Sequence, residues 1–305
     1  MTKTAFIFPG QGSQYVGMGK ALWDTDASVR ALYTRASDIA ALDVARLSFD
    51  GPDEALNDDI AAQVCVYVCN EACRMSAISA GVTPDAVTGY SMGFYSALVA
   101  AGCLDFDDGL RAVVKAGELA LRSAARTPGS MGAIIGLGLP EVEEICEAAQ
   151  GDGPVWVSNI NAARQILVSG GVAGVARAVA LAVERGALSA FALPMGAAYH
   201  SPMMEDAVAK FREYLGGVVF RAPSVPLLSY IDADFINEPS DVRDTVARQL
   251  SSRVLWKDSI LKLKEYGVTR FIEVGPGGAL TRMVRWVDRG ADAVHVDTII
   301  AAGKV

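Results

Sequence analysis

A serine flanked by glycines is the first feature of the chain that could do chemistry. Gly89, Ser91 and Gly93 form a G-x-S-x-G pattern, which follows a short apolar run at 85–88 and precedes a helical stretch ended by Gly102. Strand, sharp turn and helix in this order form a nucleophile elbow, in which the turn holds the serine exposed and strained. Glycines are needed on both sides because side chains there would collide with the neighbouring strand and helix. The alternative is a glycine-rich turn whose serine only caps the helix.

A serine nucleophile needs a base, and the chain has two histidines. His200 stands in a loop before Ser201 and Pro202, where a functional residue is expected. His295 lies in an alternating stretch typical of an edge strand, and a surface or hydrogen-bonded role explains it better. We therefore assign His200 as the base by elimination. No acidic residue has the position expected in a hydrolase triad, so a backbone or amide carbonyl is expected to orient the imidazole in a dyad.

A second glycine-rich loop, residues 9–14, follows a short strand expected at 4–8. Loops at the carboxyl ends of parallel strands are where α/β sheets place their ligands. This loop has no lysine in the position that a phosphate-binding loop requires, and no acidic residue follows as in a dinucleotide site. Its useful groups are therefore backbone N–H groups, those of Gln11 and its neighbours. A similar loop at 275–278 follows a strand expected at 270–274.

Helical patterns cover roughly 20–40, 60–80 and 106–125, and Asp105 is the expected N-cap of the third helix. One face of that third helix is apolar throughout, and it comprises Ala112, Val113, Ala116, Leu119 and Ala120. A further strand is expected at 226–230. Buried strands alternating with helices indicate an α/β fold.

The middle of the chain has a pattern of its own. Strands at 131–137, 154–160, 165–169 and 188–193 and helices at 140–149 and 172–185 give the order β-α-β-β-α-β, which is the ferredoxin-like arrangement. The ends of such a unit lie side by side, so it can be inserted into a larger domain. We therefore expect an inserted subdomain at 128–194 and a discontinuous catalytic domain formed by 1–127 and 195–305.

Composition narrows the functional classes. The 305 residues are 51% hydrophobic and carry a net charge of −8, which argues against bulk nucleic-acid binding. No apolar run is long enough for a membrane span or a signal-peptide core, so we expect a cytoplasmic protein that does not bind membranes. Cys65, Cys69 and Cys73 share one helical face with no histidine nearby, and buried small side chains explain them better than a metal site.

Five motifs stand in the same order as in a known family: FPGQGSQ at 8–14, the elbow and its helix at 89–102, NINA at 159–162, HSP at 200–202 and EVGPG at 273–277. In these motifs the chain resembles the malonyl-CoA:acyl-carrier-protein transacylases over nearly its whole length. The resemblance implies an α/β-hydrolase-like large domain with an inserted ferredoxin-like domain. It also implies an acyltransferase with no bound cofactor and no metal, working as a monomer.

The resemblance implies a role for several residues. Ser91 resembles the nucleophile that acyl-CoA acylates, and His200 resembles its base. The backbone N–H groups of Gln11 and Met92 resemble the oxyanion hole, and the main-chain carbonyl of Gln249 resembles the group that holds the histidine. The acyl group then passes to the phosphopantetheine thiol of an acyl carrier protein by ping-pong chemistry.

Three departures from the family pattern concern the acyl group. Tyr90 and Phe94 replace the family's histidine and glutamate beside the nucleophile, and Ala116 replaces the arginine that binds the malonyl carboxylate. A carboxylate buried without a partner costs on the order of several kcal/mol. We therefore expect an uncharged acyl group, or water as the acceptor, in a pocket formed by Ala116, Phe94, Tyr90, Leu121 and Asn161.

Two other functions remain open. One is an acyl-thioester hydrolase that edits acyl-carrier proteins, and the other, disfavoured because the Ser91–His200 pair is intact, is a non-enzymatic scaffold. Acyl carrier proteins are acidic as a class, so a transferase with this net charge needs a local basic patch. Arg122, Arg126 and Arg164 are the candidates, although solvated surface charges explain them equally well.

Overall fold

The larger of two sheets has six strands. The computed structural model describes residues 3–302 and places the strands in the order β10 (Asp292–His295), β9 (Val268–Glu273), β1 (Lys3–Phe8), β2 (Ala86–Gly89), β7 (Leu227–Ser229) and β8 (Asp234–Ile236). All pairs are parallel except β7 with β8. The central strand β1 is apolar and buried, as a strand covered on both faces requires.

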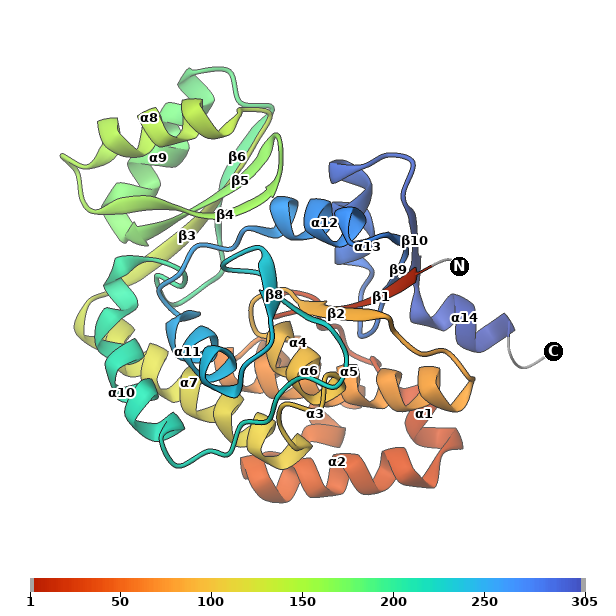
Figure 1. Ribbon diagram of the computed structural model, residues 1–305. Coiled ribbons are helices and arrows are strands. Elements are labelled where there is room, and N and C mark those ends of the chain that lie inside the picture. The colour runs from red at the N-terminus through yellow and green to blue at the C-terminus, as the bar shows by residue number, and fades with distance from the viewer. Residues whose placement is uncertain (1–2, 303–305) are drawn as a thin grey trace.

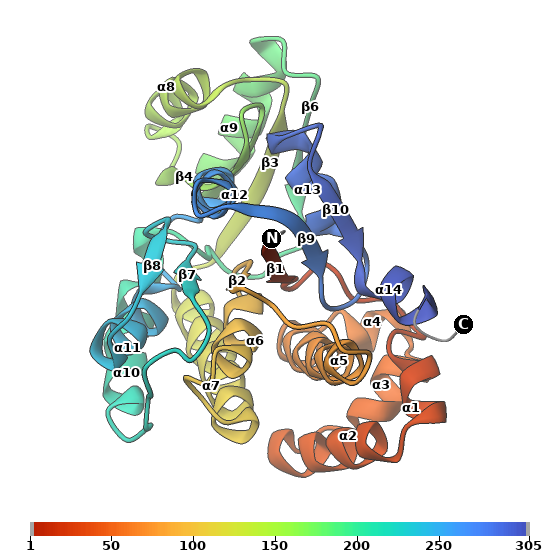
Figure 2. The same cartoon turned by 45° about the vertical axis from the view of Figure 1, so that its right-hand side comes forward.

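Helices cover both faces of this sheet (Figures 1 and 2). On one side lie α1 (Lys20–Thr25), α2 (Ala27–Ala40), α3 (Val44–Asp50), α4 (Asp53–Leu56), α5 (Asp59–Ser79), α6 (Gly93–Ala100) and α7 (Phe106–Arg126). On the other lie α12 (Trp256–Glu265) and α13 (Ala279–Val287). The short helix η1 (Pro202–Met204), α10 (Glu205–Leu215) and α11 (Pro239–Arg248) lie beyond β7, and α14 (Val296–Ala302) follows β10.

The smaller sheet stands at one end of the molecule (Figure 1). Its antiparallel strands follow the order β4 (Val155–Ala162), β5 (Gln165–Gly171), β3 (Gly129–Ile135) and β6 (Ser189–Leu193). With α8 (Leu139–Ala149) and α9 (Val172–Glu184) on one face, they form the ferredoxin-like unit. The fold is therefore an α/β domain with a second, smaller one.

The smaller unit has a hydrophobic core of its own, built from α8, α9 and the sheet face beneath them. The chain enters and leaves it at adjacent points, since a Cβ on Gly129 would lie 2.6 Å from the Cβ of Ala198. Both observations support our proposal that residues 128–194 are an inserted domain.

Several local predictions were wrong. The first helical pattern is two helices, because the carboxylate of Asp26 accepts from Ser28 N and starts α2 there. Helices α3 and α4 occupy much of the connection between the helical patterns predicted at 20–40 and 60–80. Asp105 is the N-cap residue of α7 as predicted, but its carboxylate makes no capping hydrogen bond and instead pairs with Arg221 at 3.1 Å.

Two absences concern the described part of the chain only. Within residues 3–302, no helix combines the length and apolarity needed to cross a membrane. In the same range, no group of His, Cys, Asp and Glu side chains is arranged to hold a metal ion. The cysteines at 65, 69, 73, 103 and 146 are free and buried.

Candidate active site

The elbow has the strained geometry that its glycines predict. Strand β2 ends at Gly89, α6 begins at Gly93, and Ser91 between them has φ +53°, in the left-handed region. A Cβ on Gly89 would lie 2.2 Å from the carbonyl carbon of Gly93, and a Cβ on Gly93 would lie 2.0 Å from the carbonyl oxygen of Phe8. Only glycine fits at either position, so the turn can present Ser91 beyond the sheet.

The structure brings Ser91 and His200 together, although 109 positions separate them in the sequence. Ser91 Oγ lies 2.8 Å from His200 Nε2. His200 Nδ1 lies 3.0 Å from the carbonyl oxygen of Ser252, and a carbonyl can only accept a hydrogen bond. Nδ1 therefore carries the proton of the neutral ring, and Nε2 is free to accept the proton of Ser91.

The imidazole is held in its neutral form. His200 is buried, and desolvation lowers its pKa from 6.5 to about 4, against the opposing effect of the carbonyls of Ser252 and Gln249. Within residues 3–302, no carboxylate lies within hydrogen-bond distance of the ring. The pair is therefore arranged as a dyad, with a neutral base at physiological pH.

The group that orients the base differs from the predicted one. We expected the main-chain carbonyl of Gln249, but the hydrogen bond to Nδ1 comes from Ser252, and the Gln249 carbonyl has only a weaker influence. The backbone between them also holds the histidine, since His200 N donates to Leu250 O at 2.7 Å. The segment after α11 is thus hydrogen-bonded to both the ring and the backbone of His200.

Gln11 and Met92 both line the cavity beside Ser91. A Cβ on Gly10 would lie 3.5 Å from Met92 N, so the loop after β1 passes against the elbow and places Gln11 next to it. The N–H groups of Gln11 and Met92 donate to no other protein group within the described chain. The side chain of Gln11 is fixed, because its Nε2 donates to Asp59 at 2.7 Å and its Oε1 accepts from Gln63 at 3.2 Å.

The dyad opens into a cavity of about 110 Å³ between the two sheets. Its lining is mostly apolar, and four of the residues come from the strands of the inserted unit or their ends: Met131, Asn159, Leu167 and Leu193. The remainder come from the larger domain: Gln11, Gln63, Tyr90, Ser91, Met92, Tyr95, Ala116, Met195, Tyr199, His200, Gln249 and Leu250. Within residues 3–302, no lysine or arginine lines it.

Ala116 is 3% exposed and lines the cavity, as the apolar face of α7 predicted. Lys115 and Arg122, two basic residues on that helix, do not line the cavity. Lys115 and Arg122 both lie within ion-pair distance of Glu118, at 3.5 and 3.8 Å. Within residues 3–302, the cavity therefore offers no lysine or arginine to a carboxylate.

Of the other predicted pocket residues, only Tyr90 lines the cavity. Its hydroxyl accepts from Asn159 Nδ2 and donates to Asn161 Oδ1, both at 2.8 Å, so the residue before the nucleophile is tied to β4 of the inserted unit. Asn161 serves as that anchor and does not line the cavity, which corrects our prediction.

Phe94 and Leu121 were also predicted wrongly. The ring of Phe94 is fully buried against Tyr230, with ring centroids 5.4 Å apart, because its position on α6 points into the core. Leu121 is half-buried on α7 and does not line the cavity. Gln63, Tyr199 and Ser252 also belong to the site, and no sequence motif predicted them.

Three arginines were predicted to form a docking patch, and each has a protein partner. Arg122 lies 3.8 Å from Glu118, Arg126 lies 3.2 Å from Asp206, and Arg164 Nη1 donates to Gly136 O at 2.7 Å.

The other histidine, His295, lies on the edge strand β10, where its Nε2 is hydrogen-bonded to Gly275 O. His295 is thus away from Ser91 and hydrogen-bonded, as expected.

Comparison with known proteins covers almost the entire chain. Residues 5–303 match the family described as acyl transferase domain. The malonyl CoA-acyl carrier protein transacylase of Bacillus subtilis (strain 168) is 36% identical over 297 residues, which are 97% of this chain and 94% of that protein.

Solved structures agree with this. An acyl-carrier-protein S-malonyltransferase from Burkholderia pseudomallei superposes with a TM-score of 0.94 at 35% identity, covering 100% of both chains. A malonyl-transacylase solved in complex with its type II PKS acyl-carrier protein superposes with a TM-score of 0.93 at 29% identity, covering 99% of this chain and 100% of that one.

Proposed function

Because this chain belongs to the malonyl-CoA:acyl-carrier-protein transacylase family of acyltransferases, we propose that it transfers an uncharged acyl group from CoA to an acyl carrier protein. Enzymes of this family act in fatty acid or polyketide biosynthesis. The observation that carries the proposal is the cavity at the dyad, which is lined by Ala116 and, within residues 3–302, by no lysine or arginine.

In the first half-reaction, His200 Nε2 takes the proton of Ser91 as Oγ attacks the carbonyl carbon of the acyl-CoA thioester. The negative charge that develops on the carbonyl oxygen is stabilised by the N–H groups of Gln11 and Met92. The tetrahedral intermediate then collapses, the C–S bond breaks, and His200 returns the proton to the CoA thiolate. Ser91 is left as an acyl ester.

In the second half-reaction, the phosphopantetheine thiol of the carrier protein takes the place of CoA. His200 removes the thiol proton, the sulfur attacks the acyl-serine, and Ser91 recovers the proton as it leaves. Both groups of the dyad come from one chain, so a monomer has a complete site.

The acyl group follows from electrostatics. A malonyl carboxylate in this cavity would leave water without gaining a cation, at a cost on the order of several kcal/mol. A neutral acyl chain would instead contact Met131, Leu167 and Leu193 and gain from apolar burial. The relatives' names say malonyl, so the proposal concerns how this chain differs from them.

The test is intact-mass spectrometry after incubation with a panel of acyl-CoAs, followed by addition of a holo acyl carrier protein. We expect an acyl mass on Ser91 that moves to the carrier. Release of free acid without transfer would instead identify a thioester hydrolase. No acyl mass from any CoA thioester would contradict the proposal.

A further inference from the structure

The turn that orients His200 is itself fixed by a partly exposed residue, Arg248. Ser252, whose carbonyl orients the imidazole, belongs to a tight turn after α11, in which the N–H groups of Ser251 and Ser252 both donate to Arg248 O, at 3.1 and 3.0 Å. The main chain of Arg248 thus fixes one side of the Ser252 residue, and His200 contacts the other. Any shift of Arg248 would be transmitted to the base.

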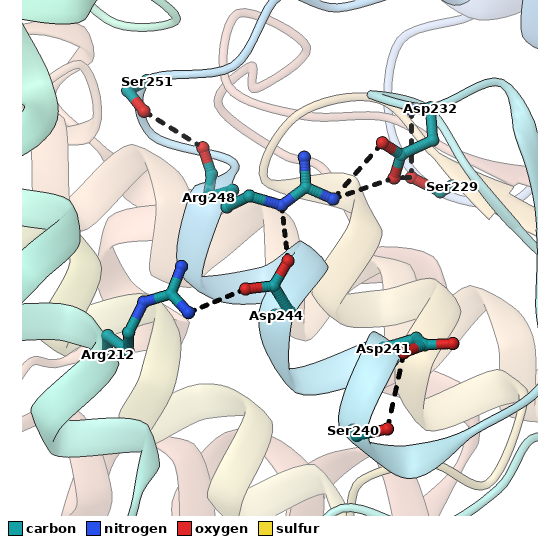
Figure 3. Close-up of polar contacts among 8 residues, drawn as sticks. All are labelled: Arg212, Ser229, Asp232, Ser240, Asp241, Asp244, Arg248 and Ser251. Atoms are coloured by element: carbon teal, nitrogen blue, oxygen red, sulfur yellow. Dashed lines mark hydrogen bonds and ion pairs between the residues drawn. The ribbon is translucent and has the colours of Figure 1, made fainter.

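The side chain of Arg248 connects this turn to two other places (Figure 3). Its Nε donates to Asp244 Oδ2 at 2.6 Å, on the preceding turn of α11. Its Nη2 lies 3.2 Å from both carboxylate oxygens of Asp232, in the connection between β7 and β8. The planar guanidinium holds both carboxylates at once in a fixed forked geometry, which a lysine ammonium does not provide.

Asp232 is in turn joined to the frame that carries the nucleophile. Its carboxylate accepts from Ser229 Oγ at 2.8 Å, at the end of β7. Strand β7 pairs with β2, and Thr88 Oγ1 donates to Leu228 O at 2.9 Å, three positions before Ser91. A continuous path of contacts therefore runs from the elbow through β7, Asp232 and Arg248 to the carbonyl on His200.

The base needs such support. His200 has φ +60°, a conformation that side chains rarely adopt and that persists only when the surroundings impose it. The Nδ1 atom of its ring is hydrogen-bonded to the main-chain carbonyl of Ser252, which lies in a turn. In a catalytic triad, a carboxylate would accept this hydrogen bond. Arg248 and its two carboxylate partners are about one-third to two-fifths exposed, and exposed ion pairs add little to stability. Their effect is therefore on geometry more than on folding.

We propose that Arg248 is a positioning residue for the base: held by Asp232 and Asp244, it fixes the turn whose Ser252 carbonyl orients His200 toward Ser91. This inference rests on the roles proposed above for Ser91 and His200, but on neither the acyl group nor the carrier. Arg248 touches no reacting atom and acts only through the turn.

The experiment is the rate at which a fluorophosphonate probe labels Ser91, because this reaction needs the serine and its base but no CoA or carrier protein. We expect Arg248→Gln to label about tenfold more slowly, since small displacements of reacting groups cost one to two orders of magnitude. Arg248→Lys should recover part of the rate, because an ammonium keeps the charge but loses the rigid planar fork of the guanidinium. With an acyl-CoA, kcat should fall in Arg248→Gln while KM stays unchanged.

Arg212→Gln is the matched control. Arg212 on α10 pairs with the other oxygen of Asp244 at 2.8 Å, so this variant removes an ion pair of the same network without touching the turn. Its labelling rate should stay within about twofold of the unmodified protein. Equal slowing by Arg212→Gln and Arg248→Gln would overturn the proposal, because the effect would then be a general disturbance of α11.

A double variant separates positioning from stability. In a His200→Ala background, Arg248→Gln should have no further effect on the residual labelling, because Arg248 acts only through the imidazole. A further loss there would overturn the proposal, as would unchanged labelling in Arg248→Gln alone. If Arg248→Gln does not fold, Asp232→Asn is used in its place, with the same expected slowing and the same contradicting results. If the unmodified protein is not labelled at Ser91, the proposed function fails and this inference fails with it.

Discussion

At the scale of single residues, the burial of His200 sets the pH range in which the dyad can work. A base must be neutral to accept a proton, and an exposed histidine loses that form below a pH of about 6.5. Burial keeps His200 neutral to much lower pH. The same burial means that the unfolded chain takes up a proton more readily than the folded one, so stability falls as the pH drops from 6.5 toward 4.

The rate of acyl-enzyme formation should therefore be nearly constant from pH 8 to about pH 5 and reach half its value near pH 4. The measurement is the initial rate with one acyl-CoA across this range, with circular dichroism at each pH to establish that the protein stays folded. An acid limb near pH 6.5 would mean that the base is solvated and that the buried geometry is not the active one.

The two groups of the dyad should fail in different ways. Ser91→Ala should form no acyl-enzyme, because no other residue takes over the attack. His200→Ala should acylate slower by orders of magnitude, because Oγ keeps its proton. His295→Ala is the control and should change the rate little, since His295 bonds Gly275 O away from the cavity. A covalent acyl mass on the Ser91→Ala protein would show that the nucleophile is another residue.

The residue types that do chemistry could be predicted from the sequence, but the backbone groups and the pocket could not. Ser91 and His200 both stand in recognisable motifs, and the chain has only two histidines. Any residue offers a carbonyl, so nothing in the sequence distinguished Ser252 from Gln249. Phe94 was misplaced because its direction depends on how α6 is rotated against Tyr230, which packing decides.

At the scale of elements, a buried acidic residue organises the glycine loop at 275–278. Glu273 ends β9 fully buried, and its carboxylate accepts from Leu280 N at 3.0 Å and from Thr281 N and Oγ1 at 2.7 Å. A carboxylate at the N-terminus of a helix satisfies amides that have no partner within the helix. The motif at 273–277 thus sets the start of α13, and Gly277 in it packs against the loop of Gln11, near Ser13 O.

Glu273→Gln should lower the free energy of unfolding by about 2 kcal/mol, because an amide nitrogen cannot accept the hydrogen bonds of Thr281. Glu265→Gln is the control, at a side chain that is 76% exposed, and should change it by no more than about 0.5 kcal/mol. The measurement is urea unfolding of both variants beside the unmodified protein. Equal midpoints for all three would contradict the capping role of Glu273.

Element types were predicted well where the hydrophobic pattern is long, and poorly where side chains choose between partners. The strands and helices of the inserted unit follow from alternation and helical spacing. Asp105 stands where a cap is expected, yet Arg221, more than a hundred positions away in the chain, takes its carboxylate. Such long-range competition leaves no mark in the local sequence.

At the scale of the whole molecule, the site exists only because two units meet. The lower face of the small sheet lines the cavity with Met131, Leu167 and Leu193, while Ser91 and His200 come from the larger domain. Tyr90 joins them through its hydroxyl, which bonds Asn159 and Asn161. The order of strands and helices at 128–194 predicted an insertion, but the cavity depends on how the two units pack.

Docking of a carrier protein belongs to this scale. Charge reversal at Arg122, Arg126 or Arg164 should raise the apparent KM for the carrier and leave acylation by acyl-CoA unchanged, because rim charges act on association with the acidic partner. Arg35→Glu, on α2 at the end of the molecule away from the small sheet, is the control (Figure 1). Equal effects on both half-reactions would count against these residues as a docking patch.

The central claim is that the acyl group is uncharged, and the initial rate of acyl-enzyme formation with malonyl-, acetyl- and longer acyl-CoAs tests it most directly. An arginine–carboxylate pair truncated in a buried setting costs about 2–5 kcal/mol, so its absence should favour a neutral acyl chain by at least about tenfold. Ala116→Arg should move the preference toward malonyl-CoA. Faster acylation by malonyl-CoA in the unmodified protein would show that a cation reaches the cavity after all, and the claim based on Ala116 would be wrong.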